Sequence, residues 1–151
     1  MPVEIEYFSD DKYKYSTALM FAYINIYKPK KTKLNLNELR FNLEHNCWKN
    51  NVKPIDVCNS ENKNKKYKNE IKRIKEADIK YPIIIDSNYN ILDGMHRYVK
   101  HIFENKKTIN VYIFDKNLIK KFVIAKHNEE IKLEINDFIE LFNKRFTPLN
   151  I

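Results

Sequence analysis

The chain has 151 residues, of which 43% are hydrophobic and 13% aromatic, so its composition supports a buried core and excludes a disordered chain. Its net charge of +8 permits an anionic partner, such as nucleic acid or a phosphorylated metabolite, but an A/T-rich genome would also produce this lysine excess. The sequence has two cysteines, no apolar run of about 20 residues and no secretory leader. These features predict a cytoplasmic protein without disulfides or membrane contact.

Hydrophobic periodicity divides the chain into strands and helices. Apolar residues that recur every three or four positions predict amphipathic helices, and β-branched runs between turn residues predict strands. The first half of the chain is predicted to contain a strand at 3–8, a helix capped within 9–11, an ambiguous segment at 23–27, a helix from 36 capped by Asn35, and a new segment from 54. A helix at about 67–77, strands at 82–85 and 91–92, and a helix at 94–104 are predicted to follow. The last predicted elements are a strand at 109–114, an ambiguous apolar segment at 118–125 and a helix capped by 136 or 137. This mixture predicts one α+β domain.

The only glycine of the chain, Gly94, stands where a β-type segment ends and a helix-type segment begins. Glycine adopts positive φ without strain and lets a ligand approach the backbone. The first N–H groups of the following helix have no helical partner, and together with the helix dipole they attract anions. His96 and Arg97 add donors, and arginine matches the geometry of phosphate. We therefore expect the turn Gly94, Met95, His96 and Arg97 to hold an anion.

Helical spacing separates the side chains after Gly94 into two groups. The apolar group is expected to pack on the sheet and consists of Met95, Val99, Ile102 and Phe103. The polar group is expected to face away from the sheet and consists of His96, Arg97, Lys100 and His101.

The stretch 82–97, which reads PIIIDSNYNILDGMHR, resembles the ParB/sulfiredoxin superfamily. In that superfamily a P-I-I-V-type strand, a hairpin and a second strand lead into a G-x-H-R or G-x-R-R turn at a helix N-terminus. The resemblance covers about residues 67–114, is looser over 34–60, and does not extend to 1–33 or 126–151. It implies a core at 34–125 with a mixed sheet flanked by helices, and two extensions at 1–33 and 126–151. It also implies that the turn binds nucleotide phosphates.

Differences within the superfamily favour one activity. Sulfiredoxins carry a reactive cysteine at the position of Met95, and chromosome-partitioning ParB proteins continue into a DNA-binding module that the residues after 114 are expected to be too few to form. The free-serine kinases read D-G-H-H-R, which is the nearest pattern to D-G-M-H-R. This resemblance implies a phosphotransferase in which Asp93 is the general base and Asp56 assists it. The expected donor is ATP or ADP with Mg²⁺, and the expected acceptor is a small hydroxyl-bearing compound.

Two other functions stay open. One is a ParB-type nucleotide-dependent DNA-binding protein or nuclease, whose lysines would contact phosphates. The other is a ligand-binding domain without catalysis. Trp48 and His101 are further candidates for substrate contact. A metal site is not expected, because His45, Cys47 and Cys58 fit no zinc spacing.

Overall fold

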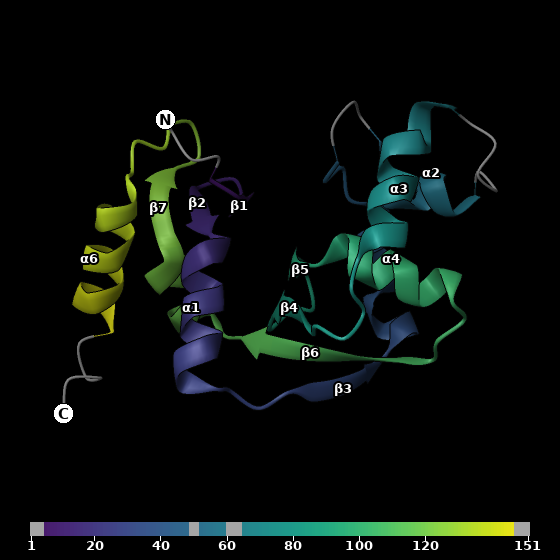
Figure 1. Ribbon diagram of the computed structural model, residues 1–151, viewed down its shortest axis with the longest axis horizontal. Coiled ribbons are helices and arrows are strands. Elements are labelled where there is room, and N and C mark those ends of the chain that lie inside the picture. Colours follow the sequence, from purple (N-terminus) through teal and green to yellow (C-terminus); the bar gives the residue numbers. More distant parts are fainter. Residues whose placement is uncertain (1–4, 49–51, 60–64, 147–151) are drawn as a thin grey trace. The chain divides into compact units, whose positions relative to one another are not determined.

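The computed structural model describes residues 5–48, 52–59 and 65–146. The chain divides into two compact units, which we call the central unit (residues 30–114) and the terminal unit (residues 1–29 together with 115–151). The α+β class is confirmed. Where one mixed sheet was expected, however, each unit has a small sheet of its own (Figure 1).

The boundaries of the units differ from the predicted core and extensions. The expected core at 34–125 covers nearly all of the central unit but runs past its end at 114. Residues 115–125 belong instead with the two predicted extensions, and the strand at 123–126 pairs within the sheet of the terminal unit.

The central unit is built on a four-stranded sheet in the order β3-β6-β4-β5. Its elements are β3 (Thr32–Asn35), the 3₁₀ helix η1 (Leu36–Glu44), α2 (Pro54–Asn59), the 3₁₀ turn η3 (Lys65–Tyr67), α3 (Lys68–Glu76), β4 (Ile83–Asp86), β5 (Ile91–Asp93), α4 (Met95–Phe103) and β6 (Thr108–Phe114). Strands β4 and β5 form an antiparallel hairpin, whereas β4 and β6 are parallel. A parallel pair needs a crossover connection, and α4 supplies it.

Strand β4 lies between β6 and β5 and is the centre of this unit. Ile83, Ile84 and Ile85 are all buried, as predicted for a strand covered on both faces. Ile83 and Ile85 belong to one hydrophobic cluster with side chains of η1, α3 and α4, among them Leu39, Leu43, Ile74 and Val99. This cluster fixes α4, and therefore its N-terminus, against the sheet.

A buried asparagine fastens η1 to the β4–β5 hairpin. The side-chain N–H groups of Asn42 donate to the carbonyl oxygens of Leu39 and Tyr89, both at 2.9 Å. Its side-chain oxygen accepts from the N–H of Ile91, also at 2.9 Å. Because both ends of the buried amide are satisfied, the hairpin that leads into Gly94 is held in a single position.

The terminal unit has an antiparallel sheet in the order β1-β2-β7. Its elements are β1 (Tyr7–Ser9), β2 (Tyr13–Ser16), α1 (Thr17–Tyr27), α5 (Lys116–Ile119), the 3₁₀ turn η4 (Lys120–Phe122), β7 (Val123–Lys126) and α6 (Ile135–Arg145). Aromatic rings from α1, η4 and the end of α6 pack together in it, namely Tyr23, Phe122, Phe142 and Phe146. Among the described residues of both units, no helix is long and apolar enough to cross a membrane.

The helix start predicted at 9–11 is wrong. The Oδ1 atom of Asp10 accepts from the N–H groups of Lys12 and Tyr13, at 2.8 and 2.7 Å, and closes a turn between β1 and β2. The helix begins at Thr17 instead, and its cap is the hydroxyl of Ser16. Aspartate stabilises turns and helix caps through the same side-chain-to-backbone bonds, so residue type alone does not separate them.

Candidate functional site

Gly94 has the backbone conformation that its sequence context predicts. It stands between β5 and α4 with φ at +106°. A Cβ atom at this position would lie 2.6 Å from Cγ2 of Ile83 on β4 and 3.0 Å from Nη2 of Arg97. Both the left-handed backbone and the packing of the turn against β4 therefore require glycine. The fold alone explains this glycine, without any ligand.

We expect Gly94→Ala to reduce the free energy of unfolding by about 3 kcal/mol, because left-handed strain and the clash with Ile83 add together. Denaturant titration measures the loss as a shift of the midpoint. Asn105→Ala is the matched control, since Asn105 is also left-handed, with φ at 57°, but is exposed. The control should lose only about 1 kcal/mol. Equal losses would contradict the role of packing against β4.

Asp93 and Arg97 form an ion pair across the turn. Nη2 of Arg97 donates to Oδ2 of Asp93, and Nη1 donates to the carbonyl oxygen of Pro82 at 3.2 Å. Each of the two charged side chains keeps 17% of its surface exposed. The guanidinium is thus oriented beside the first turn of α4 and remains within reach of a solute anion.

His96 is held between a carboxylate and an aromatic ring. Its Nε2 lies 2.6 Å from Oε2 of Glu70 on α3, and its ring stacks on Trp48 with centroids 4.7 Å apart and planes 15° apart. Glu70 is only 8% exposed, and a buried carboxylate is costly unless it is paired. Since Nε2 is directed to Glu70, Nδ1 is the ring nitrogen that can serve a ligand. Trp48 contributes here by orienting His96.

Glu70 is the site residue that the sequence analysis missed. It belongs to the amphipathic helix that was predicted correctly, four residues before the buried Ile74. Residues four apart share a helical face, so Glu70 occupies a core-facing position. A glutamate on the apolar face of a helix was the signal that could have singled it out.

The division of α4 into an apolar and a polar face was only partly correct. Met95 and Ile102 pack against the core and Val99 is fully buried, as predicted. Phe103, in contrast, is 36% exposed, and His101 is buried. Helix α4 packs on α3 and η1 as well as on the sheet, so its buried face is wider than a single stripe.

Asp56 lies in the first turn of α2 and is half-buried. Its neighbour Val57 belongs to the same hydrophobic cluster as Val99 of α4. Within the described residues, no hydrogen bond or ion pair joins Asp56 to His96 or Arg97. The residues that the structure brings together at the turn are therefore Asp93, Gly94, His96 and Arg97, with Glu70 and Trp48 behind them.

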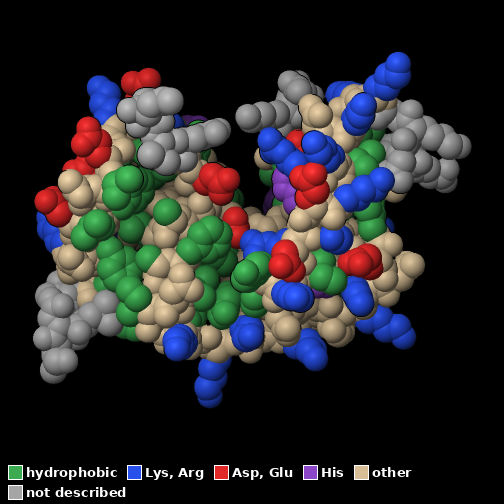
Figure 2. All heavy atoms as spheres, viewed as in Figure 1, with side chains coloured by type: hydrophobic (Ala, Val, Ile, Leu, Met, Phe, Trp, Pro, Cys, Tyr) green, Lys and Arg blue, Asp and Glu red, His purple; other side chains and the backbone are tan. Residues whose placement is uncertain are grey.

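The net positive charge of the chain comes from the central unit. Residues 30–114 contain 18 Lys and Arg against 10 Asp and Glu, whereas the rest of the chain contains 10 of each. The whole net charge of +8 therefore belongs to the unit that carries the turn. On the face seen in Figure 2, basic and acidic side chains are interspersed rather than separated into patches of one sign. This distribution suits a small anionic ligand in a local site.

Comparison of the chain with models of known families, with curated proteins and with solved structures finds no match. Among the described residues, no group of three or more His, Cys, Asp and Glu side chains is arranged to hold a metal ion. The turn itself offers a guanidinium, an oriented imidazole, the backbone N–H groups at the start of α4 and a carboxylate.

Proposed function

We propose that the protein is a nucleotide-dependent phosphotransferase of the ParB/sulfiredoxin type, which transfers a phosphoryl group from ATP or ADP to a small hydroxyl-bearing compound. One observation carries this proposal: the carboxylate of Asp93 and the guanidinium of Arg97 meet at the start of α4, next to an oriented His96. Phosphate binding alone requires the cationic groups. A carboxylate at the same place supplies the base that transfer to a hydroxyl also uses.

The phosphates would bind at the N-terminus of α4. The N–H groups of its first turn and the positive end of its dipole attract anions. Arg97 would exchange Oδ2 of Asp93 for phosphate oxygens, which accept a bidentate arginine contact. His96 would donate to phosphate from Nδ1 when its ring carries a proton on both nitrogens, because Nε2 already faces the carboxylate of Glu70. Because Glu70 and Trp48 already orient its ring, little side-chain entropy is lost on binding.

The ion pair gives Asp93 a second role in this proposal. While Arg97 donates to Oδ2, that oxygen is engaged with the guanidinium. When Arg97 turns to the phosphate, the same oxygen can accept the proton of the acceptor hydroxyl. Arrival of the nucleotide would in this way prepare the base for the acceptor.

The donor set at the turn fits a nucleotide better than a protein-bound metal. Arginine, histidine and helical N–H groups are donors to phosphate, whereas Mg²⁺ prefers several oxygen ligands. In this proposal the carboxylate of Asp93 serves as the base and is not counted as a metal ligand. Mg²⁺ would therefore arrive with the nucleotide and be held mainly by phosphate oxygens and water, where it neutralises the charge of the transferred group.

A nucleotide-dependent DNA-binding protein or nuclease is the second candidate. The observation that favours it is the concentration of the net charge of +8 in the central unit. Contacts to several DNA phosphates would make binding strongly dependent on salt.

A nucleotide screen separates the two candidates. Melting curves of the full chain are recorded with ATP, ADP, CTP and GTP, each with Mg²⁺, and nucleotide turnover is then measured with and without hydroxyl-bearing metabolites. We expect stabilisation by ATP or ADP and consumption only in the presence of an acceptor. Tight, salt-sensitive binding to random duplex DNA without turnover would reject the phosphotransferase and support the second candidate. Absence of stabilisation by every nucleotide would reject both.

A further inference from the structure

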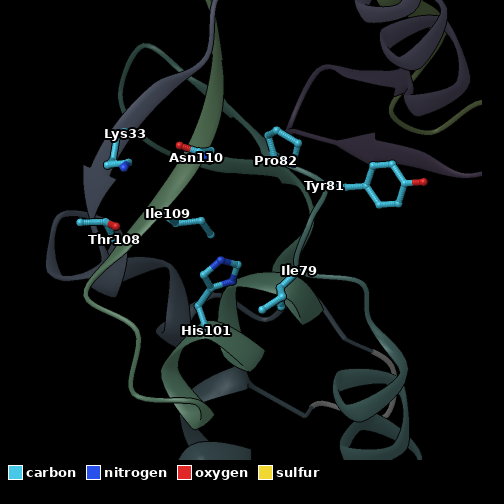
Figure 3. A pocket seen from close by; sticks show the side chains of 8 residues that line it. All are labelled: Lys33, Ile79, Tyr81, Pro82, His101, Thr108, Ile109 and Asn110. Atoms are coloured by element: carbon cyan, nitrogen blue, oxygen red, sulfur yellow. The ribbon is translucent and has the colours of Figure 1, made fainter.

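A polar cavity of about 150 Å³ opens in the central unit beside the second half of α4. Figure 3 shows side chains from β3, β6, α4 and the segment before β4 gathered around it. Among the residues that line it are Lys33, Pro82, His101, Thr108, Ile109 and Asn110. The side chains assigned to the phosphates at the turn are not part of its lining.

The cavity lies beside the first residues of β6, which pair with β3 on one side but not with β4 on the other. Strand β6 pairs with β3 from Thr108 onward, but it pairs with β4 only from Val111, opposite Ile83. Segment 79–82 therefore leaves a gap in the sheet beside the start of β6. Lys33 and Asn110 are direct partners across β3 and β6, so their side chains project from the same face.

Polar groups of three kinds gather at the mouth of this gap. Thr108 precedes Asn110 by two residues and so shares the face of Asn110 and Lys33. An ammonium, an amide and a hydroxyl thus lie together, and all three residues are exposed. The eight lining residues include no Asp or Glu, so the local field is positive.

His101 closes the cavity from the side of α4. It is 7% exposed, and its Nδ1 lies 2.7 Å from the carbonyl oxygen of Arg97. A carbonyl only accepts, so Nδ1 carries a proton and Nε2 is the second nitrogen of the ring. The imidazole points from α4 toward Ile109 (Figure 3). The side chain of Ile109 lies on the opposite face of β6 from those of Thr108 and Asn110, so His101 lines the cavity from the other side of the gap. Nε2 is thus the ring nitrogen that remains for contact with a ligand in the cavity.

We propose that this cavity binds a small oxyanion, either a carboxylate or inorganic phosphate. Lys33 supplies the charge, and Thr108 and Asn110 supply neutral donors. Nε2 of His101 accepts from a protonated oxygen of the ligand, or donates to the ligand when the ring is protonated. The volume is that of about five water molecules, which matches a small ion better than a nucleotide. This site is distinct from the turn at Gly94 and does not depend on the proposed phosphotransfer.

The test is a nuclear magnetic resonance titration of the full chain with isotope-labelled histidine. Acetate and inorganic phosphate are the probes, and sodium chloride is the ionic-strength control. Signals are assigned with single His→Gln variants. We expect the ring signals of His101 to shift saturably with at least one oxyanion but not with chloride. Because His96 lies at the turn, its signals report separately on phosphate binding there.

Variants of residues at the mouth of the cavity test whether the oxyanion binds there. Lys33→Gln is expected to weaken oxyanion binding about tenfold, and Asn110→Ala is expected to weaken it by less. Lys107→Gln is the matched control, since it removes the same charge from the exposed residue before Thr108. A missing or non-saturable His101 shift would overturn the proposal. An equal effect of Lys33→Gln and Lys107→Gln, or of chloride and the oxyanions, would reduce the site to an adventitious ion only.

Discussion

Asp93→Asn is expected to lower the rate of phosphoryl transfer by about 100- to 10,000-fold, which is the usual contribution of a positioned general base. Nucleotide affinity should stay equal or increase, because Arg97 no longer has a carboxylate competing with phosphate for its donors. This combination of slow turnover and retained binding identifies a catalytic role. Steady-state kinetics and direct nucleotide titration measure the two quantities separately.

Asp78→Asn is the matched control for Asp93→Asn. Asp78 is exposed in the same unit, and its Oδ1 accepts from the N–H of Lys80 at 3.0 Å, a bond that the amide oxygen of asparagine retains. The control should leave turnover unchanged. If Asp93→Asn keeps full activity, Asp93 is not the base. If it loses affinity and turnover in equal measure, the ion pair only shapes the binding site.

The double variant His96→Ala, Arg97→Ala is expected to weaken nucleotide binding by about 100-fold or more. Each residue contributes a hydrogen bond to a charged phosphate, and such bonds are worth about 1.5 to 3 kcal/mol each. Isothermal titration with the nucleotide and Mg²⁺ measures the loss. Arg97→Lys should fall in between, because lysine keeps the charge but loses the planar fork.

Folding of the double variant needs its own control. His96→Ala leaves the buried carboxylate of Glu70 without its partner, and Arg97 also donates to the carbonyl oxygen of Pro82. His96→Gln with Arg97→Gln retains donors at both positions and serves as the second version. Lys72→Ala with Arg73→Ala removes exposed charges from α3 and should leave affinity unchanged. Full nucleotide affinity in both versions of the double variant would reject the phosphate site.

Local patterns in the sequence predicted most elements around the turn. The β-branched run at 83–85 is a buried strand, the segment after it is a hairpin, and Gly94 has positive φ at the start of a helix. Each of these features depends on neighbours within a few residues: burial pattern, turn-forming side chains and the steric freedom of glycine. A short stretch of sequence is therefore enough to predict them.

Other features depended on contacts between distant residues. The pairing of β1 with β2 decides that Asp10 closes a turn rather than capping a helix. The burial of His101 follows from the packing of α4 on α2, α3 and η1 as well as on β4. The assignment of β7 to the terminal sheet joins residues more than a hundred positions apart. The hydrophobic periodicity of one element does not predict which distant element it will pair with or pack against.

By itself, the sequence determined the α+β class, the buried strand and the place of the glycine turn, because backbone sterics and hydrophobic period are local properties. Only the tertiary structure decided which side chains meet there. It brought the carbonyl oxygen of Pro82 to Arg97, and it brought Glu70 and Trp48 to His96 from as far as 48 residues away in the sequence. It also divided the chain into two units and opened the gap beside β6. These outcomes depend on how whole elements pack against one another. In the packed interior, a charged side chain is buried at low cost only beside a group of opposite charge or a hydrogen-bond partner.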